Sequence, residues 1–328
     1  MKEKVKEIIK KYNLINTGDK IVLGVSGGPD SIAMLDILRQ LKSEMEFEIY
    51  VVHINHSIRG EDADEDEEYV KNYCRKYEIE CFTKKIDVPT IARTEKIGTE
   101  EAGRKVRYEY FEEILKETGS NKIAIAHNKN DNVETIIMHL LRGSGISGLK
   151  GIEPIRENKF IKPLIECDRQ EIEKYCEENN LQPRIDKTNF ENECTRNKIR
   201  NIVIPYIKKE FNPNIIETMT RLSDVISSEN DFIENIAKEN YNKILVIEGK
   251  DKIELKLKEF NLLDEVLKNR IILIATKKLF GSTQGIEKVN IVDIIKLCNN
   301  NIGNKFLMPN KNLKVLIQNK KINFIKIN

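Results

Sequence analysis

A glycine-rich segment at residues 26–31 carries the residue types that bind phosphate. It reads Ser-Gly-Gly-Pro-Asp-Ser. Its two consecutive glycines, Gly27 and Gly28, let the backbone turn tightly and direct its N–H groups at an anion. Asp30 follows them, at a place where a carboxylate can cap a helix or ligate a metal ion. No Gly-Lys-Ser/Thr triplet follows, so the segment is not a Walker A loop.

The residues on both sides of this segment predict how it is held. Residues 21–25 form a short apolar, β-branched run, which is typical of a buried strand. Apolar residues at 32, 35, 38 and 41 repeat with helical spacing. A strand, a glycine turn and a helix N-terminus together make an anion site, because the helix adds roughly half a positive charge at that end. The alternative is an ordinary tight turn in an unrelated α/β protein.

Two other polar segments begin where a predicted strand ends. The strand expected over residues 48–54 leads into a segment that starts at His53, and the strand expected over residues 122–126 leads into one that starts at His127. Ligands of open parallel sheets bind beyond the carboxyl ends of the strands. The glycine-rich segment and these two therefore predict one shared site, although a lone histidine is also common as a plain structural residue.

Strands and helices alternate along the first part of the chain. The expected strands cover residues 21–25, 48–54, 81–86 and 122–126. The expected helices cover residues 2–13, 32–41, 61–77, 99–118 and 133–141. This alternation predicts an α/β fold with a doubly wound parallel sheet.

The remaining chain predicts more helices and a second domain. The expected elements are a helix over 168–179, a basic helix that includes Arg196 and Arg200 and ends at Pro205, a long helix over about 214–242, and a mixture of short strands and helices over 245–328. The chain therefore divides into a site-bearing domain over 1–212, a helical linker over 213–242, and a small basic α+β domain over 243–328.

The net charge of +2 conceals an uneven distribution. Residues 241–328 hold 17 Lys and Arg against 8 Asp and Glu, a net of +9, so residues 1–240 carry a net of −7. A basic C-terminal part suggests a polyanionic partner. The alternative is a lysine-rich composition in which these side chains are only solvated.

Composition and cysteine spacing exclude several other classes of protein. Apolar residues make up 40% of the chain and charged residues 33%, as in a globular protein. No apolar run is long enough to span a membrane, and the N-terminus lacks the apolar core of a signal peptide, so we expect a cytoplasmic location. The six cysteines form no C-x-x-C pair, which argues against a zinc ribbon, an iron–sulfur cluster or a redox dithiol.

The pattern S-G-G-x-D-S resembles the PP-loop of N-type ATP pyrophosphatases, which split ATP between its α- and β-phosphates and adenylate a carbonyl oxygen. Further segments resemble the signatures of the tRNA(Ile)-lysidine synthetase family. They are His53-x-Asn55-His56-x-x-Arg59, Glu101-Ala-Gly-Arg104-x-x-Arg107-Tyr108, His127 to Thr135, Leu141-Arg142-Gly143, Gly148-Leu149-x-Gly151, Pro163-Leu164, Asp186-x-x-Asn189 and Arg196-Asn197-x-x-Arg200. The ordered motifs cover residues 20 to about 210, and beyond that the resemblance rests on domain order.

The chain departs from the family pattern at two positions of the fourth signature. Asn128 replaces the second histidine of that signature, and Asn130 replaces the first of two adjacent aspartates, while Asp131 and Glu134 remain. We therefore expect that position 130 does not ligate a metal ion. Family members often carry a further C-terminal domain, for which 328 residues leave no room, so the resemblance predicts a short or truncated form.

The resemblance implies a reaction in two steps. ATP adenylates the 2-carbonyl oxygen of the wobble cytidine in a CAU anticodon and releases pyrophosphate, and the ε-amine of free lysine then displaces AMP to give lysidine. The implied cofactors are ATP and Mg²⁺, and the implied partners are tRNA(Ile) with a CAU anticodon and L-lysine. The oligomeric state stays open, with a dimer as one option.

The same resemblance assigns expected roles to individual residues. ATP would bind to Ser26, Gly27, Gly28, Pro29, Asp30, Ser31 and His53. The catalytic residues would be Asp30, Arg104, His127, Asp131, Arg196 and Arg200. The lysine and tRNA substrates would contact Asn55, Arg107, Asp131 and Glu134. Mg²⁺ would be held by Asp30 and Asp131, and the carboxylate that binds or deprotonates lysine stays open among Asp30, Asp131 and Glu134.

Three alternatives remain beside this interpretation. A tRNA thiolation enzyme shares the same loop, but such enzymes usually carry C-x-x-C pairs, which are absent here. An ATP-dependent amidotransferase or ligase acting on a small metabolite would not need the basic C-terminal part. A non-catalytic nucleotide-sensing module would bind ATP without releasing pyrophosphate.

Overall fold

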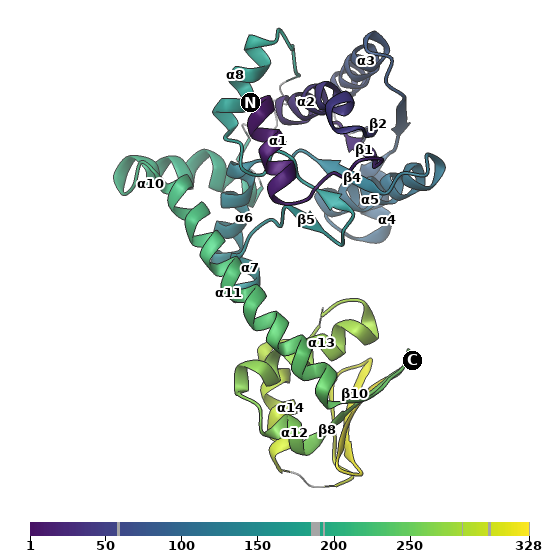
Figure 1. Cartoon of the computed structure of the whole chain (residues 1–328), viewed down its shortest axis with the longest axis vertical. Coiled ribbons are helices and arrows are strands. Elements are labelled where there is room, and N and C mark those ends of the chain that lie inside the picture. The colour runs from purple at the N-terminus through teal and green to yellow at the C-terminus, as the bar shows by residue number, and fades with distance from the viewer. Residues whose placement is uncertain (58–59, 185–190, 193, 284, 301–302, 328) are drawn as a thin grey trace. The chain divides into compact units, whose positions relative to one another are not determined.

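The computed structural model describes residues 1–57, 60–184, 191–192, 194–283, 285–300 and 303–327. The chain forms two compact units, Met1–Asp224 and Val225–Asn328 (Figure 1). A single helix, α11 (Ile215–Ile244), runs across this division. The proposed domain boundaries at residues 212 and 242 therefore stay a prediction.

The first unit is built on one six-stranded sheet with the order β3-β2-β1-β4-β6-β5. Its parallel strands are β1 (Lys20–Gly24), β2 (Glu48–Asn55), β3 (Cys81–Lys85), β4 (Lys122–Ile125) and β6 (Phe160–Ile161). The short strand β5 (Ile155–Arg156) pairs antiparallel with β6 at one edge. The predicted doubly wound parallel sheet is confirmed.

Helices cover both faces of this sheet, and the alternation of β1 explains why. Ile21 and Leu23 join one buried cluster and Val22 joins another, because successive side chains of a strand point to opposite faces. The first cluster includes residues of α1 (Lys2–Lys11), α2 (Pro29–Met45), α3 (Glu61–Lys76) and α8 (Arg169–Glu178). The second includes residues of α5 (Thr99–Glu117), on which α4 (Val88–Glu95) packs.

Helix α6 (Lys129–Leu141) begins earlier than the predicted start at residue 133. The reason is a capping box, in which the Asn128 side chain accepts from the Asp131 N–H and the Asp131 carboxylate accepts from the Asn128 N–H. The first polar residues of the fourth signature therefore lie in the first helical turn and not in a loop. A short helix, α7 (Ile146–Leu149), follows.

The prediction that a basic helix ends at Pro205 is wrong. The chain continues as α9 (Thr195–Lys198), a π-helical turn η2 (Ile199–Val203), and α10 (Ile204–Glu210), with Pro205 in the first turn of α10. Proline removes a backbone donor and crowds the preceding turn. The wider π turn directly before it accommodates both effects.

The second unit has a five-stranded antiparallel sheet with the order β7-β8-β11-β10-β9. Its strands are β7 (Leu245–Glu248), β8 (Lys252–Lys256), β9 (Phe306–Asn310), β10 (Leu313–Gln318) and β11 (Lys321–Lys326). Its helices beyond α11 are α12 (Leu257–Asn261), α13 (Glu265–Phe280) and α14 (Lys288–Asn300). A separate core that includes Phe260, Ile271 and Phe324 confirms the predicted small α+β region.

Within the described part of the chain, no helix is both long enough and apolar enough to cross a membrane.

Candidate active site

The glycine-rich loop lies between β1 and α2 and is held together by one serine. The N–H groups of Ser26 and Gly27 each donate to Ser31 Oγ at 3.2 Å. The Ser31 hydroxyl in turn donates to the Gly28 carbonyl at 3.0 Å. Gly27 has a φ of +95°, a conformation that only glycine adopts without strain. Ser31, expected to bind ATP, is thus buried and engaged within the loop itself.

A second segment braces this loop from outside. The Arg184 N–H donates to the Gly27 carbonyl at 3.0 Å, and the Arg184 guanidinium contacts the acids at the start of α3, with Nε 3.4 Å from Asp66 Oδ1. Gly28 serves as the N-cap of α2, and Pro29 begins that helix. The loop is therefore fixed at its middle and at its exit.

Asp30 lies in the first turn of α2 and faces the start of α6. Its Oδ1 accepts a hydrogen bond from Asn128 Nδ2 at 2.8 Å. Burial, and then the negative charge of Asp131, raise the pKa of Asp30 to about 6, against the opposing effect of the Asn128 hydrogen bond. A carboxyl group whose ionised form is disfavoured in this way gains free energy when a cation binds beside it.

Asn128 thus serves two structures at once. Its Oδ1 accepts from the Asp131 N–H at 2.9 Å and caps α6, while its Nδ2 donates to Asp30. Only a side chain with both an acceptor and a donor can do this, and an amide has both. The departure from the family pattern at position 128 therefore has a clear structural role.

Arginine side chains bind the carboxylates of α6. Arg200 on the π turn η2 donates to both Glu134 oxygens, from Nε at 2.6 Å and from Nη2 at 2.8 Å, and its Nη2 also donates to Asp131 Oδ1 at 3.0 Å. Arg196 Nη2 donates to Thr135 Oγ1 at 2.9 Å. Glu134 is 1% exposed, so this bidentate ion pair is shielded from solvent and fixes the position of the Arg200 guanidinium.

Both histidines of the expected site are neutral near pH 7. Burial lowers the pKa of His127 to about 4; the charge of Asp131 opposes that shift, while those of Arg196, Lys162 and Arg107 add to it. Burial also lowers the pKa of His53. His53 Nδ1 lies 2.9 Å from the Val25 carbonyl oxygen, which can only accept, so this nitrogen carries the proton.

Several expected site residues have other partners. The Asn55 amide donates to Asp64 Oδ1 at 2.7 Å and its oxygen accepts from the Ser57 N–H at 3.0 Å, which secures the start of α3. Arg104 and Arg107 are exposed on α5, where Arg104 lies over the Tyr108 ring. Three motif residues lie outside the described residues: Arg59, Asp186 and Asn189.

Asn130 points away from the carboxylates. Its Oδ1 accepts from the Arg169 N–H at 3.1 Å and so joins the start of α6 to the start of α8. The Arg169 guanidinium returns to the site, with Nη2 3.6 Å from both Asp131 Oδ1 and Glu134 Oε1. The sequence analysis did not predict Arg169, because an arginine at the first position of a helix carries no sequence signal for an ion pair with a distant segment.

The carboxylates of the site suit a metal ion that takes most of its ligands from substrate phosphates and water. The described residues contain no group of three His, Cys, Asp or Glu side chains arranged to hold a metal. Asp30 and Asp131 are two carboxylates close enough for one to affect the pKa of the other. Mg²⁺ is commonly bound by one or two carboxylates together with phosphates and water, so the residues fit that ion.

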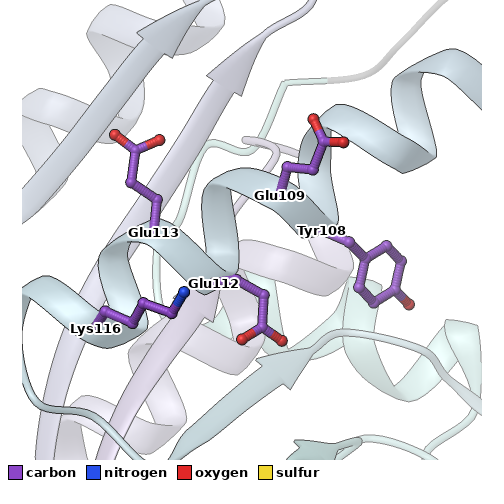
Figure 2. A pocket seen from close by; sticks show the side chains of 5 residues that line it. All are labelled: Tyr108, Glu109, Glu112, Glu113 and Lys116. Carbon is purple, nitrogen blue, oxygen red and sulfur yellow. The ribbon is translucent and has the colours of Figure 1, made fainter.

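A surface hollow on α5 lies apart from these residues. It is lined by Tyr108, Glu109, Glu112, Glu113 and Lys116, which project from one helix (Figure 2). Three carboxylates against one lysine repel phosphate. We therefore assign the hollow no part in the site.

Comparisons with known proteins identify the family of this chain. Residues 1–207 match the family model of a PP-loop domain. The chain is 45% identical over 313 residues to a tRNA(Ile)-lysidine synthase of Clostridioides difficile, covering 95% of this chain and 68% of that protein. A Clostridium acetobutylicum protein of the same name is 45% identical over 302 residues, 92% of this chain and 65% of its own length. One from Petrotoga mobilis is 38% identical, with 90% and 95% covered. The chain thus spans about two thirds of the first two relatives.

A solved structure supports the fold alone. The U34-tRNA thiolase NcsA from Methanococcus maripaludis, with its [4Fe-4S] cluster, superposes with a TM-score of 0.57 at 18% identity, over 69% of this chain and 78% of that one. The domain match covers more than half of the chain, and the identity to the curated relatives extends over nearly all of it. The chain belongs to the tRNA(Ile)-lysidine synthase family, whose PP-loop domain uses ATP.

Proposed function

We propose that the chain ligates free lysine to the wobble cytidine of a CAU-anticodon isoleucine tRNA, with ATP converted to AMP and pyrophosphate. The observation that carries this proposal is the 2.8 Å hydrogen bond between Asn128 and Asp30. It joins the phosphate-binding loop to the carboxylates that begin α6. This closeness supports a single site in which the nucleotide and the amine are held beside each other.

The loop supports the first step. The turn at Gly27 and Gly28 and the N-terminus of α2 present partial positive charge to the ATP phosphates. Mg²⁺, held by Asp30 and Asp131, would offset charge on the phosphate oxygens. The cytidine 2-oxygen attacks the α-phosphorus, and pyrophosphate leaves with the electrons of the broken P–O bond. Arg196 and Arg104 are the candidates for stabilising charge on the α-phosphate, and neutral His127 can donate one hydrogen bond there.

The carboxylates support the second step. The lysine ε-ammonium must lose a proton before it can attack. Arg200 holds both Glu134 oxygens and one Asp131 oxygen, and the other Asp131 oxygen accepts from the Asn128 N–H. Asp30, which accepts from the neutral Asn128 amide, is therefore our first candidate to face the ammonium and accept its proton. The amine nitrogen then forms a bond to C2 of the cytidine, and AMP leaves with the former 2-oxygen. We expect this work to take place in the cytoplasm, where ATP, lysine and tRNA are found together.

The test combines the protein, labelled lysine, Mg²⁺·ATP and a CAU-anticodon transcript. We expect label in the RNA and one pyrophosphate released per lysine. A matched transcript with uridine at the wobble position should accept no label, because it lacks the cytidine. Pyrophosphate release without RNA would indicate a small-molecule ligase, and ATP binding without any pyrophosphate would indicate a sensor. Either result would contradict the proposal.

A further inference from the structure

Lys162 is a buried lysine whose charge has no ion-pair partner among the described residues. It follows β6 directly and is 5% exposed, and the Phe160 carbonyl, at 3.4 Å, is the one hydrogen-bond acceptor of its Nζ in the described part of the chain. No carboxylate of the described residues lies within 4.0 Å of this ammonium. A second buried lysine, Lys122, differs: its Nζ donates to the Leu14 carbonyl at 2.8 Å and lies 3.7 Å from Asp19 Oδ2.

The position of Lys162 places it at the ligand-binding edge of the sheet. Strands β4 and β6 are parallel, with Ile123 opposite Phe160 and Ala124 opposite Ile161. Lys162 therefore leaves the sheet at the same edge as the segment that carries His127. Its charge acts on His127, and the charges of Arg156, Glu153, Glu157 and Arg104 act on Lys162 itself. Burial, and then Arg156, lower the pKa of Lys162 to about 8, so the side chain is still mostly charged near pH 7.

An ammonium has three donors, and here one of them has a long hydrogen bond. Burying a charge without a partner destabilises a fold, so such a group persists where a ligand supplies the missing acceptors. Charges of both signs act on this ammonium, since Glu153 and Glu157 oppose the effect of Arg156 and Arg104. The unused donors of the ammonium itself therefore point to an anionic ligand with several acceptor oxygens. We infer that Lys162 contacts a phosphoryl group of a substrate. This inference rests on the proposed function, which supplies two such groups, the phosphates of ATP and the tRNA backbone phosphate next to the target cytidine.

The first test measures stability and affinity together. Lys162→Met keeps an unbranched side chain, one atom shorter, and removes its charge. We expect the ligand-free variant to melt at the same temperature as the wild type or higher, because an unpaired buried charge is gone. Lys122→Met should melt lower, since it breaks a buried pair. Lys159→Met is the matched surface control, because Lys159 is only partly buried and pairs with Glu112 at 2.7 Å.

The second test identifies the source of the phosphate. For ATP, the Kd of Mg²⁺·α,β-methylene-ATP should rise about 10-fold in Lys162→Met, the scale of one charge-assisted hydrogen bond, with tRNA affinity unchanged. For the RNA backbone, the Kd of the CAU transcript should rise instead, and its log–log salt slope should fall by about 0.7–0.9. Lys162→Arg should keep part of the lost affinity.

Two results would overturn the inference. One is a Lys162→Met variant that melts well below the wild type or fails to fold, which would mean that the ammonium is satisfied within the protein. The other is a stable variant with both affinities unchanged. Wild-type protein in the lysine-ligation assay separates the two proposals: if it ligates lysine and Lys162→Met binds normally, only the inference fails, and if it is inactive, the proposed function fails.

Discussion

The raised pKa of Asp30, about 6, predicts how folding stability depends on pH in the absence of substrate. Its folded-state pKa lies above the ordinary value of 3.8, so the folded protein holds the proton more tightly than the unfolded chain. Folding stability should therefore fall as pH rises from about 4 to about 6, by on the order of 1–3 kcal/mol. Asp30→Asn should remove this loss, which denaturant unfolding at both ends of that range can measure.

The same variant should lose activity while it gains stability. An amide cannot offset a metal ion's charge, so pyrophosphate release by Asp30→Asn should drop at least about 100-fold. Asp62→Asn, an exposed change in the acidic start of α3, is the control and should alter neither property. A folded Asp30→Asn protein that releases pyrophosphate at the wild-type rate would remove Asp30 from the mechanism.

Asn130 and Asp131 are adjacent, and they should respond differently to substitution. Asn130 accepts one backbone hydrogen bond from Arg169, so Asn130→Ala should cost about 1 kcal/mol of stability and less than about 10-fold in lysine ligation. Asp131 both caps α6 and pairs with Arg200, so Asp131→Ala should lower kcat/KM by about 100-fold or more. Equal losses in kcat/KM would show that Asn130 takes part in the chemistry after all.

At the scale of elements, the π turn η2 sets the direction of Arg200. Removing one residue from it, for example the exposed Ile202, should restore α-helical winding and turn Arg200 by about 100° relative to α10. We expect the shortened protein to keep its helical circular dichroism and to lose lysine ligation to the same extent as Arg200→Ala.

The matched control is Ile202→Ala, which changes the side chain and keeps the residue count. It should ligate lysine at a nearly normal rate. If the deletion variant is as active as this control, the π turn does not position Arg200.

Local patterns predict the elements that depend on local patterns. The apolar run before Ser26 and the helical spacing after Ser31 are sufficient for a strand, a glycine turn and a helix, and the structure has them. The start of α6 escapes the same reasoning because Asn128 caps a helix whose first turn is polar, so apolar periodicity begins one turn later. Pro205 wrongly predicts a helix end, because the π turn that lets the helix continue past it has no characteristic residue pattern in the sequence.

The sequence predicts which loops form the site, but it does not predict which side chains form ion pairs there. Asp30, Asp131 and Glu134 follow from motif spacing, but their arginine partners come from segments far along the chain. Lys162 could have been noticed, since a lysine follows two apolar residues directly before the Pro163-Leu164 motif. Its lack of an ion-pair partner among the described residues is a three-dimensional fact that no spacing reveals.

At the scale of the whole molecule, the uneven charge predicts that the C-terminal part of the chain contributes most to tRNA binding. Residues 241–328 carry a net of +9, and Lys305, Lys311 and Lys314 have no carboxylate partner among the described residues. Changing these three lysines to glutamine should weaken binding of the CAU transcript. The slope of log affinity against log salt should become shallower by up to about 0.9 for each phosphate that is no longer neutralised. ATP affinity should not change, because every loop motif lies in the first unit.

The control is the same change at Lys252, Lys278 and Lys321, which pair with Glu248 or Glu254. Since two carboxylates already offset most of the charge of these three lysines, this triple variant should keep a slope nearer that of the wild type. Identical slopes for both triple variants and the wild type would mean that the lysines of the second unit are only solvated surface.

The place of β1 in the sheet determines how the glycine-rich loop can move. This strand pairs with β2 on one side and β4 on the other, and Ile21, Val22 and Leu23 are fully buried. Amide protons in such a strand exchange with deuterated solvent only when the whole unit unfolds, whereas the short β5–β6 pair at the edge can open by itself. We therefore expect the loop to be anchored on one of the slowest-exchanging strands of its unit. Any rearrangement that accompanies a catalytic cycle should then come from the segments that contact the loop and not from β1.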